Sequence, residues 1–164
     1  MTNNMTDKTK PMLAALTALV MGAVFASGGS VTAQEVNPVS PELTPKLRDL
    51  LRKEMLSVED ASKQILSALI AGDDARVADL AQQIHDSFIL QQSMTPQDKQ
   101  DLMSVVSKDF VTRDRAFHQL AASLAEAGRD GNRARQHEQF GQMIDACTAC
   151  HALYASDRFP KLVE

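Results

Sequence analysis

The stretch FGQMIDACTACHALY, residues 140–154, contains both cysteines of the chain and its only tyrosine. Two residues separate Cys147 from Cys150, and His151 follows directly, which gives the pattern C-x-x-C-H. Apolar residues recur at helical spacing along the stretch and predict one face of a helix. At about 100° per residue, the two cysteines and the histidine then fall within an arc of about 100° on that helix.

This arrangement presents two thiols and an imidazole on one side of a helix. Two thiols can form thioethers with the two vinyl groups of a haem, and the imidazole then approaches the iron from the same side. We therefore expect one covalently bound haem c, with Cys147 and Cys150 as its anchors and His151 as the proximal iron ligand. Three alternatives remain. A zinc site needs a fourth ligand, a redox dithiol needs a βαβ context, and a disulfide has poor geometry inside a helix.

The rest of the chain predicts further helices. Thr44-Pro45 and Thr95-Pro96 each combine a capping side chain with a proline at the first helical position. In the first helix, apolar residues share one face at Leu47, Leu51, Met55, Val58, Ile65 and Leu69. The predicted segments are 44–71, 74–90, a short one at 96–106, 108–127 and 132–155. We predict an all-α, antiparallel four-helix bundle with a C-terminal haem-attachment helix and one short extra helix.

The composition agrees with this class. The chain has 164 residues, of which 44% are hydrophobic and only 4% aromatic. That length supports one domain with a core, and the shortage of aromatic residues argues against a β-sandwich or barrel.

The first 33 residues have the order of a secretory signal. Lys8 and Lys10 precede an apolar run of 15 residues, 12–26, and Val31 and Ala33 suit a cleavage site. The run spans roughly 22 Å as a helix, less than the ~30 Å of a bilayer core. We predict cleavage and export to the periplasm, a linker at 34–43 and the bundle at 44–164.

Cleavage would remove two of the 17 Lys and Arg residues and one of the 21 Asp and Glu residues, which leaves a net charge of −5. The sequence has no cluster of Lys and Arg residues, so we do not expect nucleic-acid binding. It has no second apolar run long enough to cross a bilayer, so we do not expect membrane insertion after cleavage. No phosphate-binding loop or nucleophile–base pattern predicts a catalytic residue.

C-x-x-C-H on the last helix of an exported bundle, with Tyr154 three residues after His151, resembles the class II c-type cytochromes. These include cytochrome c-prime and its low-spin relatives. The resemblance implies a distal group from the first helix, which is a Met in low-spin members and an apolar residue in five-coordinate ones. Met55 is then the candidate distal ligand, with a role in core packing as its alternative, and His118 is a less favoured ligand. The family commonly has a basic residue after the tyrosine, where this chain has Ala155, and Arg158 lies one turn further on.

The resemblance implies an electron carrier rather than an enzyme, with iron cycling between Fe(III) and Fe(II). The alternative is a five-coordinate haem protein that binds NO or CO. Tyr154, Phe117 and Phe140 are candidate walls of the haem pocket. The acidic chain is expected to bind a redox protein through a basic patch on that partner, and to be a monomer or a homodimer.

Overall fold

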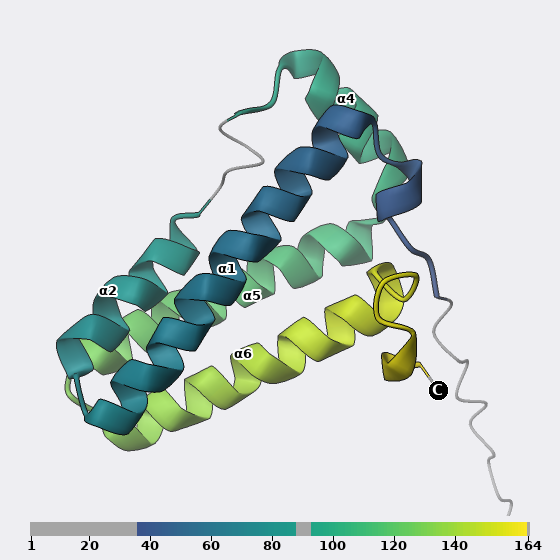
Figure 1. The fold of residues 1–164 in the computed structure, drawn as a ribbon. Coiled ribbons are helices and arrows are strands. Elements are labelled where there is room, and N and C mark those ends of the chain that lie inside the picture. Colours follow the sequence, from purple (N-terminus) through teal and green to yellow (C-terminus); the bar gives the residue numbers. More distant parts are fainter. Residues whose placement is uncertain (1–35, 88–92, 164) are drawn as a thin grey trace, which may run out of the picture. The chain divides into compact units, whose positions relative to one another are not determined.

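A computed structural model describes residues 36–87 and 93–163, all of which belong to one unit, Ala33–Glu164. Within those ranges every regular element is a helix, as predicted (Figure 1). The α-helices are α1 (Pro45–Ala71), α2 (Asp74–His85), α4 (Pro96–Val105), α5 (Lys108–Arg129) and α6 (Arg133–Tyr154). Two short 3-10 helices are η1 (Ser40–Glu42) and η2 (Pro160–Leu162). The predicted signal segment and the end of the predicted second helix lie outside the described residues.

The helices begin where the sequence predicts. The Thr44 side chain accepts a hydrogen bond from the Leu47 amide at 3.3 Å, and Asn132 caps α6 in the same way. Thr95 and Asp98 form a reciprocal capping box at the start of α4. Gly72 ends α1 in the left-handed conformation, with φ 69°, which a glycine adopts without steric cost.

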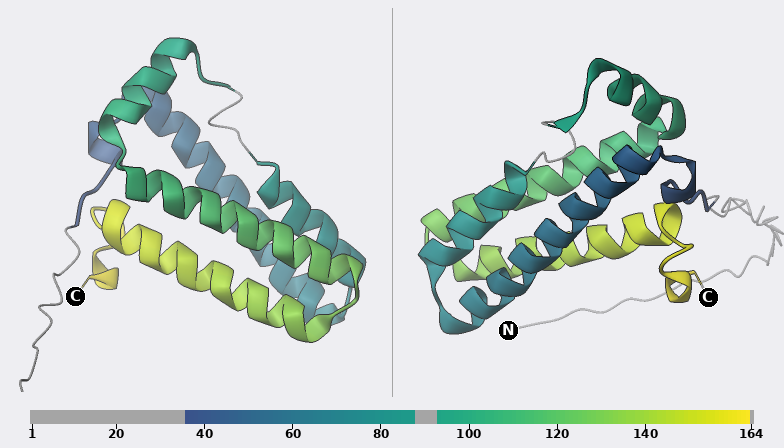
Figure 2. Two further views of the ribbon diagram at one scale, coloured as in Figure 1. Left: turned by 180° about the vertical axis from the view of Figure 1, so that it is seen from behind. Right: turned by 45° about the horizontal axis from the view of Figure 1, so that its top comes forward.

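Four of the helices form the bundle. α2 packs against both α1 and α5, and α5 packs against α6, whereas α1 and α6 touch in only a few places. Figures 1 and 2 show that α1 and α6 lie close together at the C-terminal end of α1 and diverge toward its N-terminal end. The C-terminal turns of α6, which carry the C-x-x-C-H motif, therefore lie at the end where these two helices are apart. We call this the open end of the bundle.

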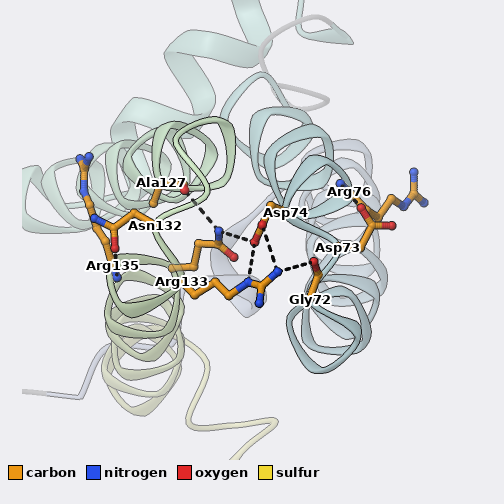
Figure 3. A network of polar contacts seen from close by, with 9 residues as sticks. Gly72, Asp73, Asp74, Arg76, Ala127, Asn132, Arg133 and Arg135 are labelled. Carbon is orange, nitrogen blue, oxygen red and sulfur yellow. Dashed lines mark hydrogen bonds and ion pairs between the residues drawn. The ribbon is translucent and has the colours of Figure 1, made fainter.

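The other end is closed by a set of polar contacts that we call the turn clasp (Figure 3). The buried Gln136 side chain of α6 donates through Nε2 to Asp74 Oδ1 at 2.9 Å and to the Ala127 carbonyl at 3.2 Å. Arg133 donates to the Gly72 carbonyl at 3.2 Å. The pKa of Asp74 is lowered mainly by its hydrogen bond from Gln136 and, to a smaller extent, by its hydrogen bond from Arg133. The clasp joins the α1–α2 turn to the α5–α6 turn.

The buried face of α1 differs from the predicted one. Leu47, Val58 and Ile65 are buried as predicted, but Met55 remains 37% exposed. The face turns instead toward Leu50, Glu54, Ala61 and Ala68. Glu54 can be buried because its carboxylate accepts a hydrogen bond from the Ser87 hydroxyl at 2.6 Å. The prediction that Met55 belongs to the central apolar stripe was therefore wrong.

The segment predicted as a linker packs against the bundle instead of connecting loosely to it. The amide of Asn37 donates to the Leu153 carbonyl at 2.8 Å, and that of Val39 donates to the Tyr154 carbonyl at 2.9 Å. The side chains of Val39 and Leu43 are buried in a cluster with Leu47, Val106 and Tyr154. This part of 34–43 thus covers the end of α6.

Within the described ranges, no helix combines the length and apolar character needed to cross a bilayer.

Near the clasp, α2 and α5 approach so closely that only a glycine fits at Gly128. A Cβ at this position would lie 2.7 Å from the Ala78 nitrogen and 2.9 Å from its Cα. Both are backbone atoms, so a clash there cannot be relieved by a side-chain rotation. The helix backbones themselves must separate to accommodate any larger residue.

We predict that Gly128→Ala destabilises the protein by roughly 1–3 kcal/mol or more, because it forces α2 and α5 apart. Urea unfolding of the purified protein measures this free energy. Gly141→Ala is the matched control, since a Cβ there has no neighbour within 4 Å. It should stabilise α6 by ~0.5–1 kcal/mol. Equal effects of the two substitutions would contradict the close approach.

Candidate functional site: the C-x-x-C-H end of α6

One stripe of α6 leads from the core to the candidate haem site. Phe140, Ile144, Cys147 and His151 fall within an arc of about 60° on the helix. Phe140 packs against the main core cluster. Further along the stripe, Ile144 is 45% exposed and the cysteine and histidine are half-buried. The stripe is therefore covered by protein at the closed end and only partly covered at the open end.

Both cysteines are free thiols in a partly apolar environment. Cys150 packs against the cluster around Leu47 and Tyr154. Burial raises the pKa of Cys147, and it raises the pKa of Cys150 to about 11. The positive charge of Arg113 opposes the rise at Cys150. Neither thiol has the lowered pKa of a reactive cysteine, which is the property that redox dithiol chemistry requires.

The His151 ring stacks on Phe159, with ring centroids 4.6 Å apart and an angle of 9° between planes. Burial lowers the pKa of His151, and the nearby charge of Arg158 lowers it further. Both effects favour the neutral imidazole, which is the form that binds a metal. Arg158 therefore brings a positive charge to the histidine although Ala155 replaces the basic residue that the family commonly has after the tyrosine.

Met55 lies on the flank of α1 that leads toward the cysteines. Relative to the buried Glu54, Leu51 and Met55 are about 60° and 100° to one side, and Gln64 is about 80° to the other. Gln64 accepts a hydrogen bond from Arg76 of α2 at 2.5 Å, so that side faces α2. Leu51 packs into the same cluster as Cys150. Met55 is one turn beyond Leu51 on this flank.

The residues at the open end fit a haem. The side chains of Met55, Ile144 and Phe159 are 37%, 45% and 39% exposed, and each comes from a different segment of the chain. A haem held by the motif would supply apolar surface to cover such side chains. The donor set, two thiols and a neutral imidazole on one side of a helix, matches covalent attachment with one axial ligand.

Three further residues of the predicted site, Phe117, Phe140 and His118, contact the core of the bundle. Phe117 and Phe140 are partly buried and pack against the main core cluster. The Nδ1 atom of His118 is 3.0 Å from the Ile84 carbonyl, and its Nε2 atom is 3.9 Å from Asp114. Both ring nitrogens of His118 thus have polar neighbours on α2 and α5, which is what a hydrogen-bonded core histidine requires.

Tyr154 is buried, and its hydroxyl donates to Asp109 of α5 at 2.7 Å. Sequence reasoning missed Asp109 and the buried Glu54, because carboxylates are normally counted as surface residues. The capping position of Ser107 just before Asp109 was the available signal for Asp109, since it places that carboxylate in the first turn of a helix. For Glu54 no signal in the sequence marks burial.

The zinc alternative would require a cluster of ligands. In the part of the chain that the structure describes, no group of three or more His, Cys, Asp or Glu side chains is arranged to hold a metal ion.

A helical bundle with a half-covered C-x-x-C-H stripe on its last helix defines a c-type haem protein. The family model for cytochrome c' matches residues 50–155, and the chain belongs to this family. Members of the family carry covalently attached haem c, and haem c is therefore the cofactor of this chain. No curated protein and no solved structure matches the chain significantly.

We predict that Ile144→Ala destabilises the haem-loaded protein by roughly 1–2 kcal/mol, because the haem buries this side chain. Met103 of α4 is the control, since it is 58% exposed and lies outside the predicted site. Met103→Ala should change the stability by no more than about 0.5 kcal/mol. Chemical unfolding followed by circular dichroism measures both. An effect at Ile144 no larger than at Met103 would show that the stripe stays exposed.

Proposed function

We propose that this protein is a periplasmic electron carrier in which Cys147 and Cys150 attach one haem and His151 and Met55 bind its iron. The bound haem supplies a one-electron Fe(III)/Fe(II) couple. The chain supplies two thiols, a neutral imidazole and a thioether, and its bundle limits the access of water to them. The observation that carries the proposal is the position of Met55, one turn beyond Leu51 on the flank that reaches Cys150.

Each of these residues has a definite task. The thiols of Cys147 and Cys150 would hold the haem covalently, and the imidazole of His151 would bind its iron. The thioether of Met55 would favour the ferrous state and so raise the reduction potential relative to a second histidine. Export to the periplasm is supported by the lysines, apolar run and small-residue exit of residues 1–33.

A second candidate is a five-coordinate haem protein that binds NO or CO. The match to the cytochrome c' family supports it. So does Leu51, an apolar side chain on the same flank as Met55 that packs near Cys150. If Leu51 faces the iron in place of Met55, the sixth position holds no protein ligand.

The choice between the two is decided by Met55→Leu, which removes the thioether and keeps an apolar side chain. If Met55 binds the iron, the purified ferrous protein resists CO, and Met55→Leu changes the optical spectrum from low-spin to high-spin and allows CO to bind. Met143→Leu is the control, because Met143 is buried in the main core cluster, and it should leave the spectrum unchanged.

Two results would contradict Met55 ligation. One is a wild-type ferrous protein that binds CO directly, and the other is a Met55→Leu spectrum identical to that of the wild type. Direct CO binding would favour the gas-binding protein, whereas an unchanged low-spin spectrum would point to another sixth ligand such as His118. Neither result would affect the assignment of the two cysteines and His151.

A further inference from the structure

The last turn of α6 carries the haem motif at the open end of the bundle. Leu47 and Leu51 of α1 belong to the cluster around it, and contacts from other segments also hold it. The carbonyls of Leu153 and Tyr154 accept hydrogen bonds from Asn37 and Val39. These bonds satisfy two of the carbonyl groups that a helix end leaves without a partner. They fix the backbone of the turn but leave its position against α5 to side chains.

Tyr154 supplies that side-chain contact. Its hydroxyl donates to Asp109 Oδ2 at 2.7 Å, and its ring packs edge-on against Phe110, with centroids 5.1 Å apart and planes at 80°. The hydroxyl also lies 3.3 Å from the hydroxyl of Ser107, the N-cap of α5. Tyr154 thus joins the end of α6 to the first turn of α5.

Asp109 is the junction of the contacts. The same oxygen that accepts from Tyr154 also accepts from Arg113 Nε at 2.7 Å. The bond from Arg113, followed by that from Tyr154, lowers the pKa of Asp109. The carboxylate is therefore ionised at neutral pH, and charge-assisted hydrogen bonds of this kind are stronger than neutral ones.

The contacts reach the turn of α6 that carries the haem motif. Tyr154 follows His151 by three residues, so it shares the last turn of the helix with the proximal ligand. Arg113 is joined to this turn through Asp109, whose Oδ2 accepts from both Arg113 and Tyr154. Residues that hold metal ligands in place from behind commonly tune the metal's properties.

We propose that Tyr154, Asp109 and Arg113 form a positioning network that holds the haem-bearing turn of α6 against α5 and sets the electrostatic environment of the iron. The inference rests on the proposed attachment of haem at Cys147, Cys150 and His151. It assigns a task to Arg113 and Asp109 beyond that attachment, because these side chains act on the iron through the residues that bind it.

The test compares reduction potentials of haem-loaded variants. Arg113→Gln removes the positive charge paired with Asp109 at the haem-bearing turn, which makes the ferric state more favourable. We expect the Fe(II)/Fe(III) ratio at a fixed ambient potential to fall by up to about tenfold. A tenfold fall corresponds to a reduction potential lower by about 59 mV. Tyr154→Phe keeps the ring against Phe110 and removes only the hydroxyl. It should lower the potential in the same direction, by a smaller amount.

Lys108→Gln is the matched control, because it removes one positive charge from an exposed side chain of the same helix. Solvent screens that charge, so its removal should leave the ratio within about twofold of the wild type. Electron paramagnetic resonance of the ferric proteins provides a second readout. The g-values should change in Tyr154→Phe and Arg113→Gln and remain those of the wild type in Lys108→Gln.

A purely structural role would lower the melting temperature of Tyr154→Phe and Arg113→Gln and leave potential and g-values unchanged. That result would overturn the network proposal. If the wild-type protein instead carries no covalent haem, the proposed function itself fails, which the optical spectrum of the starting material shows before any variant is made.

Discussion

Gln136 lies buried between the two helix turns at one end of the bundle, and its amide donates to Asp74 and to the carbonyl of Ala127. A buried amide without partners would be costly, so these bonds specify how the α1–α2 turn meets the α5–α6 turn. The nearby contact of Gly128 with the backbone of Ala78 sets the distance between α2 and α5. With this end held tightly, the relative directions of α1 and α6 decide how far apart they are at the other end (Figure 2).

That separation explains why the motif is at the end of α6. Along the stripe, Phe140 packs against the core, Ile144 is exposed, and His151 stacks on Phe159, which is itself 39% exposed. A haem supplies a large, flat apolar surface for the remainder, in a chain that has no tryptophan and one tyrosine. The two cysteines, which are the only ones in the chain, then serve one purpose as anchors of the same group.

Much of the fold is predictable because its signals are local. Thr44-Pro45, Thr95-Pro96 and Asn132 mark helix starts by short-range hydrogen bonds, and each was placed correctly. Which face of α1 is buried is not decided by local signals. The apolar pattern alone favours Met55 over Glu54 for the interior, and the buried Glu54 accepts a hydrogen bond from Ser87 on another segment. The packing of Val39 and the Tyr154–Asp109 contact also join segments distant in the sequence.

The central claim is that the two cysteines of α6 hold one haem covalently, and the mass of the intact, purified protein tests it most directly. After extraction with acidified acetone, which removes haem that is not covalently bound, the account predicts one haem retained per chain and none in a Cys147→Ser/Cys150→Ser variant. A purified protein with the mass of the polypeptide alone would contradict the account.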